Sequence, residues 1–411
     1  MRDLTLVIML LSLAWMAWRL PWVGLLGLLF IGILHPQNYA ADFMRGFPAY
    51  SSLMGVVFLS LGWQLWWQRV FPPLFWDWRL VLIGGIWAWF GLSSYFALNP
   101  LPARDKFLEL LKILPPMLLV FVLIDSQEKL RWLLLTIALA IAALILKGGY
   151  WAFITGFQDR VYGPYGSAYG GNNEFAIVTT MAIPLFVYWY RSLQGRWPRF
   201  AVGCLIVLGF ASALSSWSRG GVLSLGAVAV LLVWQSRNKW LAAPLLFAGV
   251  GFAYVGLPDA WFARMETLGA PELEDSAASR MLVWQVGWEY AVNHPWLGAG
   301  LQSWILFTPP DAELRAWHSA YVQMAVEHGL VGLGLWGFLL IATLFQLSRL
   351  IALGRCVAAP WISDQAAALR ASLVAYLVGA AFLSIAYWEL LYLLVAAALV
   401  LQYQAYSSVR G

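Results

Sequence analysis

The stretch LSSWSRGGVLSLG, residues 214–226, joins two long apolar runs through a short turn that carries a single arginine. No Asp or Glu lies within thirty residues of Arg219 in either direction. A guanidinium keeps its proton at any physiological pH, so this charge needs water or an anion beside it. Gly220 and Gly221 let the backbone turn and approach its neighbours closely. The pattern predicts two helices of a membrane bundle whose connection lies at a surface.

The composition of the whole chain agrees with a membrane protein. Of its 411 residues 62% are hydrophobic and only 11% are charged, whereas soluble domains carry about 25% charged residues. Apolar runs close to the roughly 20 residues that cross a bilayer recur along the sequence. They lie at 3–18, 21–35, 50–67, 78–96, 112–125, 128–147, 173–191, 199–215, 219–235, 240–257, 329–348, 367–387 and 389–405. We therefore expect an all-α polytopic membrane protein with about 12 transmembrane helices.

The positions of Lys and Arg predict the orientation of these helices, because short cytoplasmic loops are enriched in both residues. Three short connections carry such clusters, formed by Arg191, Arg196 and Arg199, by Arg237 and Lys239, and by Arg349, Arg355 and Arg370. The net charge of +5 is accounted for by such loops and does not indicate nucleic-acid binding. The 215–219 turn and the long polar insertion then lie outside. The predicted division is N-terminal transmembrane helices (1–257), an outer loop with helices (258–328) and C-terminal transmembrane helices (329–411).

The insertion contains SRMLVWQVGWEYAVNHPWLGAG, residues 279–300, which has the spacing of a helix. Arg280, Trp284 and Trp288 recur every four residues and would form one stripe. We expect this helix to begin after the acidic residues between 272 and 275 and to end near Asn293, because a proline follows. An apolar stripe outside the bilayer is typical of a helix that lies against the bundle or the membrane surface.

A third polar segment, WHSAYVQMAVEHGLVGLGLW at 317–336, precedes an apolar run. His318 and Tyr321 lie one turn apart at the start of a predicted short helix, and Gly329 is expected to end it. His318 would then lie near the membrane surface, on the same side as Arg219 and Arg280.

These residue types favour a particular chemistry. Two permanent cations can clamp a phosphate or diphosphate, and a histidine can accept a proton near neutral pH. Together they suit attack of a hydroxyl on a carbon that bears a diphosphate leaving group. No cluster of acids suggests a divalent metal, so we expect a metal-independent mechanism without a cofactor. Simpler readings stay open: Arg219 could reach toward lipid headgroups, Arg280 could pair with a nearby acid, and His318 could cap a helix.

The motifs resemble those of the bacterial O-antigen ligase and polymerase family. They are S-x-S-R-G-G at 216–221, R-M-L-V-W with H-P-W-L-G-A-G at 280–300, and W-H-S-A-Y-V-Q-M-A-V-E-H-G-L-V-G at 317–332, and GPYGSAYGGNNEFA at 163–176 is similar to an upstream element. Ser319 stands where the family usually has Asn, and Val322 where it has Leu. The resembling region runs from about 160 to 332.

The resemblance implies a GT-C-like glycosyltransferase of lipopolysaccharide biosynthesis. Such an enzyme lies in the bacterial inner membrane with its active site and large loop facing the periplasm. It takes a glycan from undecaprenyl diphosphate and, as a ligase, passes it to the lipid A-core with inversion. Position by position, Arg219 and Arg280 match the diphosphate-binding arginines, and His318 matches the histidine that activates the acceptor.

Other positions have several interpretations. Arg160 is a candidate phosphate ligand or a loop anchor, and Tyr321 lines the acceptor path or only packs. Ser218 and Gly220 flank the arginine of the turn and are candidate substrate contacts. Asn172 and Asn173 would cap a helix.

We expect an O-antigen ligase as the first choice. A repeat-unit polymerase and a protein O-oligosaccharyltransferase are the alternatives within the same chemistry. From another class, a lipid or glycan transporter would show internal repeats and charges in the middle of its spans. No internal repeat is found, and the unusual charges lie in outer loops.

Overall fold

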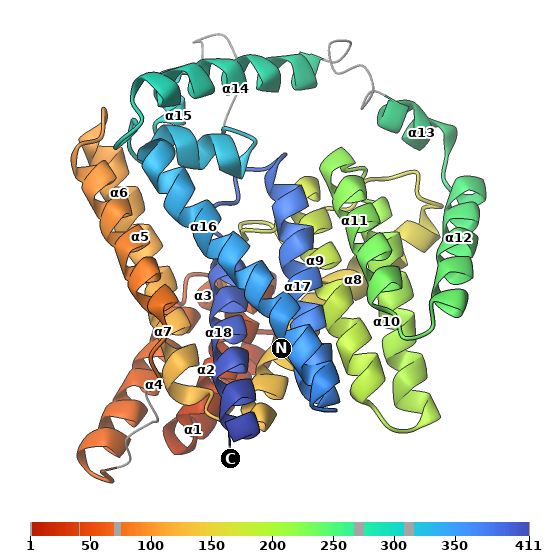
Figure 1. Ribbon diagram of the computed structural model, residues 1–411, viewed down its shortest axis with the longest axis horizontal. Helices are drawn as coiled ribbons and strands as arrows, with labels where there is room; N and C mark the ends of the chain where they lie inside the picture. The colour runs from red at the N-terminus through yellow and green to blue at the C-terminus, as the bar shows by residue number, and fades with distance from the viewer. Residues whose placement is uncertain (1, 41, 70–74, 267–274, 308–315, 411) are drawn as a thin grey trace.

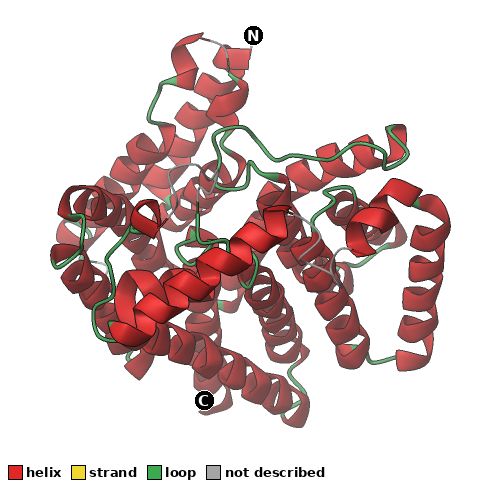
Figure 2. Ribbon diagram, turned by 90° about the horizontal axis from the view of Figure 1, so that it is seen from above, coloured by secondary structure: helices red, strands yellow, loops and turns green. Residues whose placement is uncertain are grey.

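The computed structural model describes residues 2–40, 42–69, 75–266, 275–307 and 316–410, and every regular element in these ranges is a helix (Figures 1 and 2). The first ten are α1 (Arg2–Arg19), α2 (Pro21–Leu34), η1 (Pro36–Tyr39), α3 (Asp42–Arg45), α4 (Ala49–Trp66), α5 (Trp78–Tyr95), α6 (Pro100–Leu110), η2 (Leu111–Ile113), α7 (Leu114–Leu123) and α8 (Gln127–Ile154). The next five are α9 (Asn172–Ser192), α10 (Arg196–Leu214), α11 (Arg219–Gln235), α12 (Lys239–Gly256) and α13 (Asp259–Glu266). The last five are α14 (Asp275–Asn293), α15 (Trp304–Phe307), α16 (Ala320–Cys356), α17 (Pro360–Ala380) and α18 (Glu389–Arg410). The predicted all-helical class is confirmed.

Five of the described helices are long and apolar enough to cross a membrane, namely α8, α10, α12, α16 and α18, and α2 and α11 are shorter apolar helices. Each of the apolar runs found in the sequence overlaps a helix, but about 12 spans and a GT-C-like arrangement stay predictions. Helix α12 contains no buried residue and lies at the outer edge of the bundle (Figure 1). A helix so apolar and so exposed fits a lipid environment.

The core of the bundle is built around α8, α9, α16, α17 and α18. In α18 the run LLVAAALVL at 393–401 is buried on all sides. A helix that is hydrophobic all round belongs in the centre of a bundle, and its alanines allow neighbouring helices to approach closely.

The two ends of the bundle differ, because a helix lies across only one of them in the described part of the chain. Helix α14 lies across the end at which α11 and α16 begin and α17 finishes (Figure 1). The helix ends at Asn293 as predicted, whereas Glu272 and Glu274 of the expected acidic lead-in lie outside the described residues. At the opposite end α11 and α16 finish and α12 and α17 begin. The polar segments found in the sequence therefore gather at one end.

Helix α16 is kinked at Gly329, whose φ of 71° interrupts the helical backbone. The segment that follows α14 docks into this kink. The N–H groups of Ala299 and Gly300 donate to the carbonyl oxygens of Val326 (2.7 Å) and Glu327 (3.0 Å). The kink thus exposes carbonyl groups that a neighbouring main chain satisfies. The expected interruption of the helix at Gly329 is confirmed.

Helix α17 differs from the prediction, since it ends at Ala380 and residues 381–388 form an apolar loop. Backbone groups of this loop are hydrogen-bonded within turns, for example Phe382 N, which donates to Gly379 O (3.0 Å). The Tyr376 hydroxyl donates to Ile385 O (2.8 Å). Hydropathy cannot tell a buried loop of this kind from a helix, because both are apolar. The predicted run at 367–387 was therefore placed too far along the chain.

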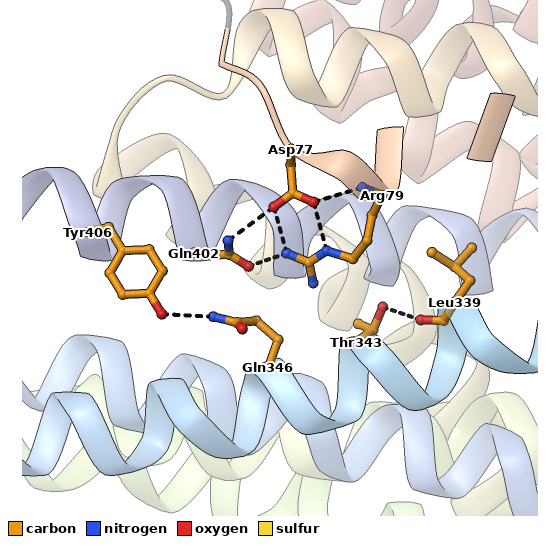
Figure 3. Close-up of polar contacts among 7 residues, drawn as sticks. All are labelled: Asp77, Arg79, Leu339, Thr343, Gln346, Gln402 and Tyr406. Atoms are coloured by element: carbon orange, nitrogen blue, oxygen red, sulfur yellow. Dashed lines mark hydrogen bonds and ion pairs between the residues drawn. The ribbon is translucent and has the colours of Figure 1, made fainter. Parts of the chain in front are cut away.

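The ion pair of Asp77 and Arg79 is buried inside the bundle, where the start of α5 meets α18 (Figure 3). Asp77 caps α5 by accepting from Arg79 N (2.9 Å), and its second oxygen accepts from Arg79 Nη2 (2.9 Å). Gln402 donates to Asp77 (3.0 Å) and accepts from the same guanidinium. A buried charge is tolerated when it is paired and hydrogen-bonded in this way.

Candidate functional site

The turn between α10 and α11 is held by its own serines. Ser218 is the N-cap of α11, and its hydroxyl accepts from Gly221 N at 3.1 Å. Ser216 donates to Ala213 O (2.5 Å) and accepts from Ser218 N (3.2 Å). Both serines are buried, so their hydroxyls satisfy the turn that presents Arg219. Contact of Ser218 with a substrate stays a prediction.

The two glycines of the turn permit close packing, as the sequence indicates. A Cβ at Gly221 would overlap Ala176 of α9, and one at Gly220 would press against Phe382 in the 381–388 loop. Arg219 itself is half-buried at the first position of α11. The turn is thereby fixed between α9 and the loop that follows α17.

The start of α9 joins this turn by a side-chain bond. Asn172 Nδ2 donates to Ser216 O at 2.8 Å, and the N-cap position is occupied by Gly171. The expectation that Asn172 and Asn173 cap the helix is therefore wrong for α9, since the amide of Asn172 is used to hold a neighbouring segment. Glu174 follows in the same first turn and is half-buried.

His318 lies in the short connection before α16, in a left-handed backbone conformation with φ of 50°. Its N–H donates to Ser384 Oγ at 2.8 Å, so the 381–388 loop holds it in place. The adjacent Trp317 is 1% exposed and accepts from Trp284 Nε1 at its carbonyl oxygen (2.7 Å). Such a conformation is uncommon for a residue other than glycine, and these bonds maintain it. Ser319, and not His318, caps the helix that follows.

Arg280 of α14 and His318 lie close enough to interact electrostatically. Burial and the charge of Arg280 lower the pKa of His318 from 6.5 to about 4. The same guanidinium attracts the carboxylate of Glu174 on α9. At neutral pH the imidazole is therefore uncharged beside a permanent cation.

The 381–388 loop connects the two halves of the site. Phe382 packs on Gly220, next to Arg219, and Ser384 bonds to the backbone of His318. Because only one residue separates Phe382 from Ser384, the arginine of the turn and the histidine belong to the same end of the bundle. Contacts on α9, α14 and this loop connect the three polar segments, and the convergence of Arg219, Arg280 and His318 on one substrate stays a prediction.

The remaining predicted residues occupy different places. Arg160 is exposed beside the turn, with its guanidinium carbon 5.7 Å from the ring centre of Trp217. Val161 N donates to Ser215 O at 3.0 Å and ties that loop to the turn. Tyr321 is half-buried, and its hydroxyl donates to Leu377 O of α17 (2.8 Å). Arg160 thus belongs to the neighbourhood of Arg219, and Tyr321 is fixed against α17.

A buried polar network beside His318 was not predicted from the sequence. Glu327 accepts from Tyr387 OH (2.6 Å) and from Trp317 Nε1 (3.3 Å). His328 meets Tyr387 OH through Nε2 (2.7 Å) and Ser93 Oγ through Nδ1 (2.5 Å). Tyr387 has one proton and donates it to Glu327, so Nε2 of His328 carries the proton between those two rings.

A signal for this network is present in the sequence. Glu327 and His328 are adjacent titratable residues that precede Gly329 in an otherwise apolar stretch. Ionisable groups at such a position are costly and need partners. Their partners, Ser93 and Tyr387, come from distant parts of the chain, and only the fold brings them together. The network also holds Trp317, the residue next to His318, through the bond from its indole to Glu327.

A further arginine also lies at the turn. Arg264 of α13 donates from Nε to Trp217 O at 3.0 Å. It gathers with Arg160 and Arg219 around residues 215–219, so this turn is the basic part of the site. Together these features define a helical membrane protein with a polar site, made of arginines and a histidine, at the end of its bundle that α14 covers.

Comparison with known proteins agrees with this description. Residues 204–337 match the family described as O-antigen ligase, and residues 1–193 match a family of unknown function (DUF5935). The first match includes Arg219, Arg280 and His318. Over residues 204–337 the resemblance of this chain to the O-antigen ligase family is thus confirmed.

A curated relative is the exopolysaccharide production protein ExoQ of Rhizobium meliloti (strain 1021). The two sequences are 25% identical over 258 residues. The match covers 56% of this chain and 56% of the relative, so each protein is matched over little more than half of its length.

Proposed function

We propose that this protein transfers a glycan from undecaprenyl diphosphate to the lipid A-core of lipopolysaccharide. The observation that carries the proposal is the neutral imidazole of His318 beside the permanent cation of Arg280, within the region that matches the O-antigen ligase family. This pairing supplies a base and an anion-binding group at one place, as displacement of a diphosphate requires.

The reaction is a single displacement. The acceptor hydroxyl attacks the anomeric carbon while its proton passes to His318. The bond between that carbon and the diphosphate oxygen breaks, and the diphosphate leaves with the electron pair. Arg219 and Arg280 bind the charge that develops on the leaving group, and inversion at carbon follows from one displacement. No metal ion and no cofactor takes part in this scheme.

The electrostatics of the site support an order of binding. Burial and the charge of Arg280 make the imidazole of His318 a weak base whose pKa is about 4. A bound diphosphate offsets the charge of Arg280 and so raises the basicity of the imidazole. His318 then becomes an effective base when the donor is in place, which limits reaction in its absence.

The other predicted contacts have subordinate roles in this scheme. Arg160 lies beside the turn that carries Arg219 and would bind an outer phosphate or sugar oxygen. Ser218 caps α11, and Gly220 and Gly221 let the turn pack on the 381–388 loop and on α9. Ser218 and Gly220 would contact the donor at this turn. Tyr321, fixed to α17, would border the path of the acceptor.

The proposed location is the bacterial inner membrane, with the site facing the periplasm and a GT-C-like arrangement of helices. The basic loops at the opposite end of the bundle support this orientation, since short cytoplasmic loops are rich in Lys and Arg. The lipid-linked donor would reach the site from the outer leaflet.

A second candidate is polymerisation of repeat units on the same donor. The name of the relative, an exopolysaccharide production protein, favours it. Both activities use the same diphosphate clamp and the same base, and they differ only in the hydroxyl that attacks.

A transfer assay separates the candidates. Purified protein is incubated, with a metal chelator, with undecaprenyl-diphosphate glycan and lipid A-core. Glycan on the core supports the ligase, and longer lipid-linked glycan alone supports the polymerase. Transfer to a Ser or Thr of an added acceptor protein would indicate the protein O-oligosaccharyltransferase. Movement of lipid-linked glycan across a vesicle membrane without any product would indicate a transporter and contradict the proposal.

His318→Ala tests the role of the base. We expect transfer to fall by about 10²–10³, within the range that general-base catalysis contributes, while the protein still folds and inserts. His294→Ala is the matched control, because His294 is exposed after α14 and its ring bonds to Tyr290 O of that helix. Wild-type rates in His318→Ala would remove this residue from the mechanism.

A further inference from the structure

A second polar feature lies at the end of the bundle opposite to His318. An open cavity of about 870 Å³ is bounded by the end of α11, the start of α12, the last turns of α16 and the first half of α17. We name it the basic cavity after four side chains that line it, those of Arg237, Lys239, Arg355 and Arg370. Its lining residues include no Asp or Glu. Its volume lies in the range of about 300–1,000 Å³ that is typical of ligand pockets.

Arg370 extends into the apolar part of α17 and is held there by neutral groups. Its Nη1 donates to Ser348 Oγ of α16 at 3.0 Å. With the Gln235 amide oriented so that its nitrogen donates to Ala367 O (3.2 Å), the amide oxygen accepts from Arg370 Nη2 at 3.3 Å. The Nε of Arg370 is buried and has no hydrogen-bond partner among the described residues. The guanidinium is thus positioned with part of its donor capacity unused.

The charges around Arg370 are not balanced by acids of the described chain. Arg355 lies near enough to repel Arg370 electrostatically. Asp364 on α17 is shared between Arg237, which lines the cavity (3.6 Å), and Arg191 (3.8 Å). Two guanidiniums that face each other at the edge of a membrane bundle are stabilised by an anion between them.

The walls of the cavity indicate what carries that anion. Leu231, Leu344, Ile351 and Val374 make the cavity partly apolar, and Trp234 at its rim is 72% exposed. Exposed Trp side chains at helix ends are typical of the level of lipid headgroups. A basic floor with apolar walls between transmembrane helices fits a headgroup with its acyl chains better than a soluble ion.

We infer that the basic cavity binds the phosphate of an anionic phospholipid, with Arg355 and Arg370 on the headgroup and α11, α16 and α17 along the acyl chains. The site is separate from the proposed transferase centre. Helix α11 alone runs for 17 residues between the two, a length of roughly 25 Å at 1.5 Å per residue. Because the same three helices border both places, a lipid here would also hold their spacing at the other end.

Binding is measured by native mass spectrometry of the purified full chain, titrated with phosphatidylglycerol and, in parallel, with phosphatidylcholine. We expect phosphatidylglycerol to be retained much more tightly. Arg355→Gln should raise its Kd about fivefold, which corresponds to roughly 1 kcal/mol for one cation near a headgroup. Arg349→Gln is the matched control: Arg349 lies on the same helix but is exposed and stacks on Phe345, away from the cavity.

Three results would overturn the inference: equal retention of the two lipids, an unchanged Kd in Arg355→Gln, or inorganic phosphate that binds as tightly as phosphatidylglycerol. The last result would assign the cavity to a soluble anion. Arg370→Gln should weaken binding further than Arg355→Gln. If that variant does not fold, Arg370→Lys, which keeps the charge but loses the planar fork, should give an intermediate Kd.

Discussion

Arg79 and Arg370 are two arginines inside the same bundle with opposite surroundings. Arg79 is 2% exposed, and Asp77 and Gln402 enclose its guanidinium (Figure 3). Arg370 bonds to the neutral groups of Ser348 and Gln235 and faces a second arginine across a cavity. An arginine that is closed by an acid stabilises the fold. One that lines a cavity or a site is available to bind an anion, and we propose this role for Arg370 and, at the other end of the bundle, for Arg280, whose charge also acts on Glu174 and His318.

The largest effect is expected where the closed pair is broken. Asp77→Ala leaves the guanidinium of Arg79 buried without its acid, which should lower the free energy of unfolding by about 3–5 kcal/mol. Unfolding in detergent micelles, followed by denaturant titration, measures it. The double variant Asp77→Leu/Arg79→Met should regain most of this loss, because no unpaired charge remains. An unchanged midpoint of unfolding in Asp77→Ala would show that Asp77 does not stabilise the buried guanidinium of Arg79.

The arginine at the proposed transferase site should affect activity rather than stability. Arg280→Gln removes a charge next to His318 and should lower the transfer rate by about 10²–10³, or roughly 3–4 kcal/mol of transition-state stabilisation. The midpoint of unfolding should stay close to that of the wild type, since Arg280 is only half-buried. Glu289→Gln, an exposed change on the same helix, serves as the control. A large loss of stability with normal activity would reverse the assignment.

The pH dependence of transfer sharpens the comparison further. Because the pKa of His318 is about 4 in the free protein, kcat/KM should fall as the pH drops through about 4, where the imidazole becomes protonated. The acid limb of kcat should lie at a higher pH, since a bound diphosphate offsets Arg280. In Arg280→Gln the limb of kcat/KM should also move upward. Identical limbs in the two proteins would mean that the two side chains do not interact.

The same pKa predicts a change in stability. An unfolded histidine titrates near 6.5, and in the folded protein the pKa is lower. The unfolded chain therefore takes up this proton first, so the contribution of His318 to stability is present above pH 6.5 and is lost as the pH falls toward 4. His318→Ala should flatten this part of the profile.

The smallest effect is expected from a neutral contact. Trp284→Phe removes the bond from the indole to Trp317 O, which should cost about 0.5–1.5 kcal/mol. Trp288→Phe on the same helix is the control, because Trp288 is 48% exposed. Comparison of kcat and KM tells whether the loss acts through the position of His318. Equal behaviour of both variants would argue against a role of α14 in holding that segment.

Much of this organisation could be read from the sequence. The helices, the turn at Arg219, the end of α14 at Asn293 and the break at Gly329 follow from apolar runs and from Pro and Gly signals. The sequence also placed Arg280 and His318 on the same side of the membrane, but the contact of α14 with the segment before α16 came only from the structure. Composition does not say which loops of a bundle meet.

The features that the sequence did not predict share one cause. The 381–388 loop is as apolar as a helix, and its contribution of Ser384 and Tyr387 depends on where the chain folds back. Glu327 and His328 are visible as unusual residues, but their partners lie far away in the sequence. The helices that enclose the basic cavity are likewise brought together by packing alone.

The docking of residues 295–300 into the kink of α16 has a consequence for how this chain can diverge. The bonds of Ala299 and Gly300 join main-chain atoms, and these persist whatever side chains surround them. Gly298 and Gly329 are restricted to glycine at this contact, because a methyl group at either would collide with main-chain atoms of the facing segment, and a methyl group at Gly300 would collide with Ala97 after α5. Substitutions on the outward face of α14 can therefore accumulate while residues 295–300 stay docked in the kink of α16.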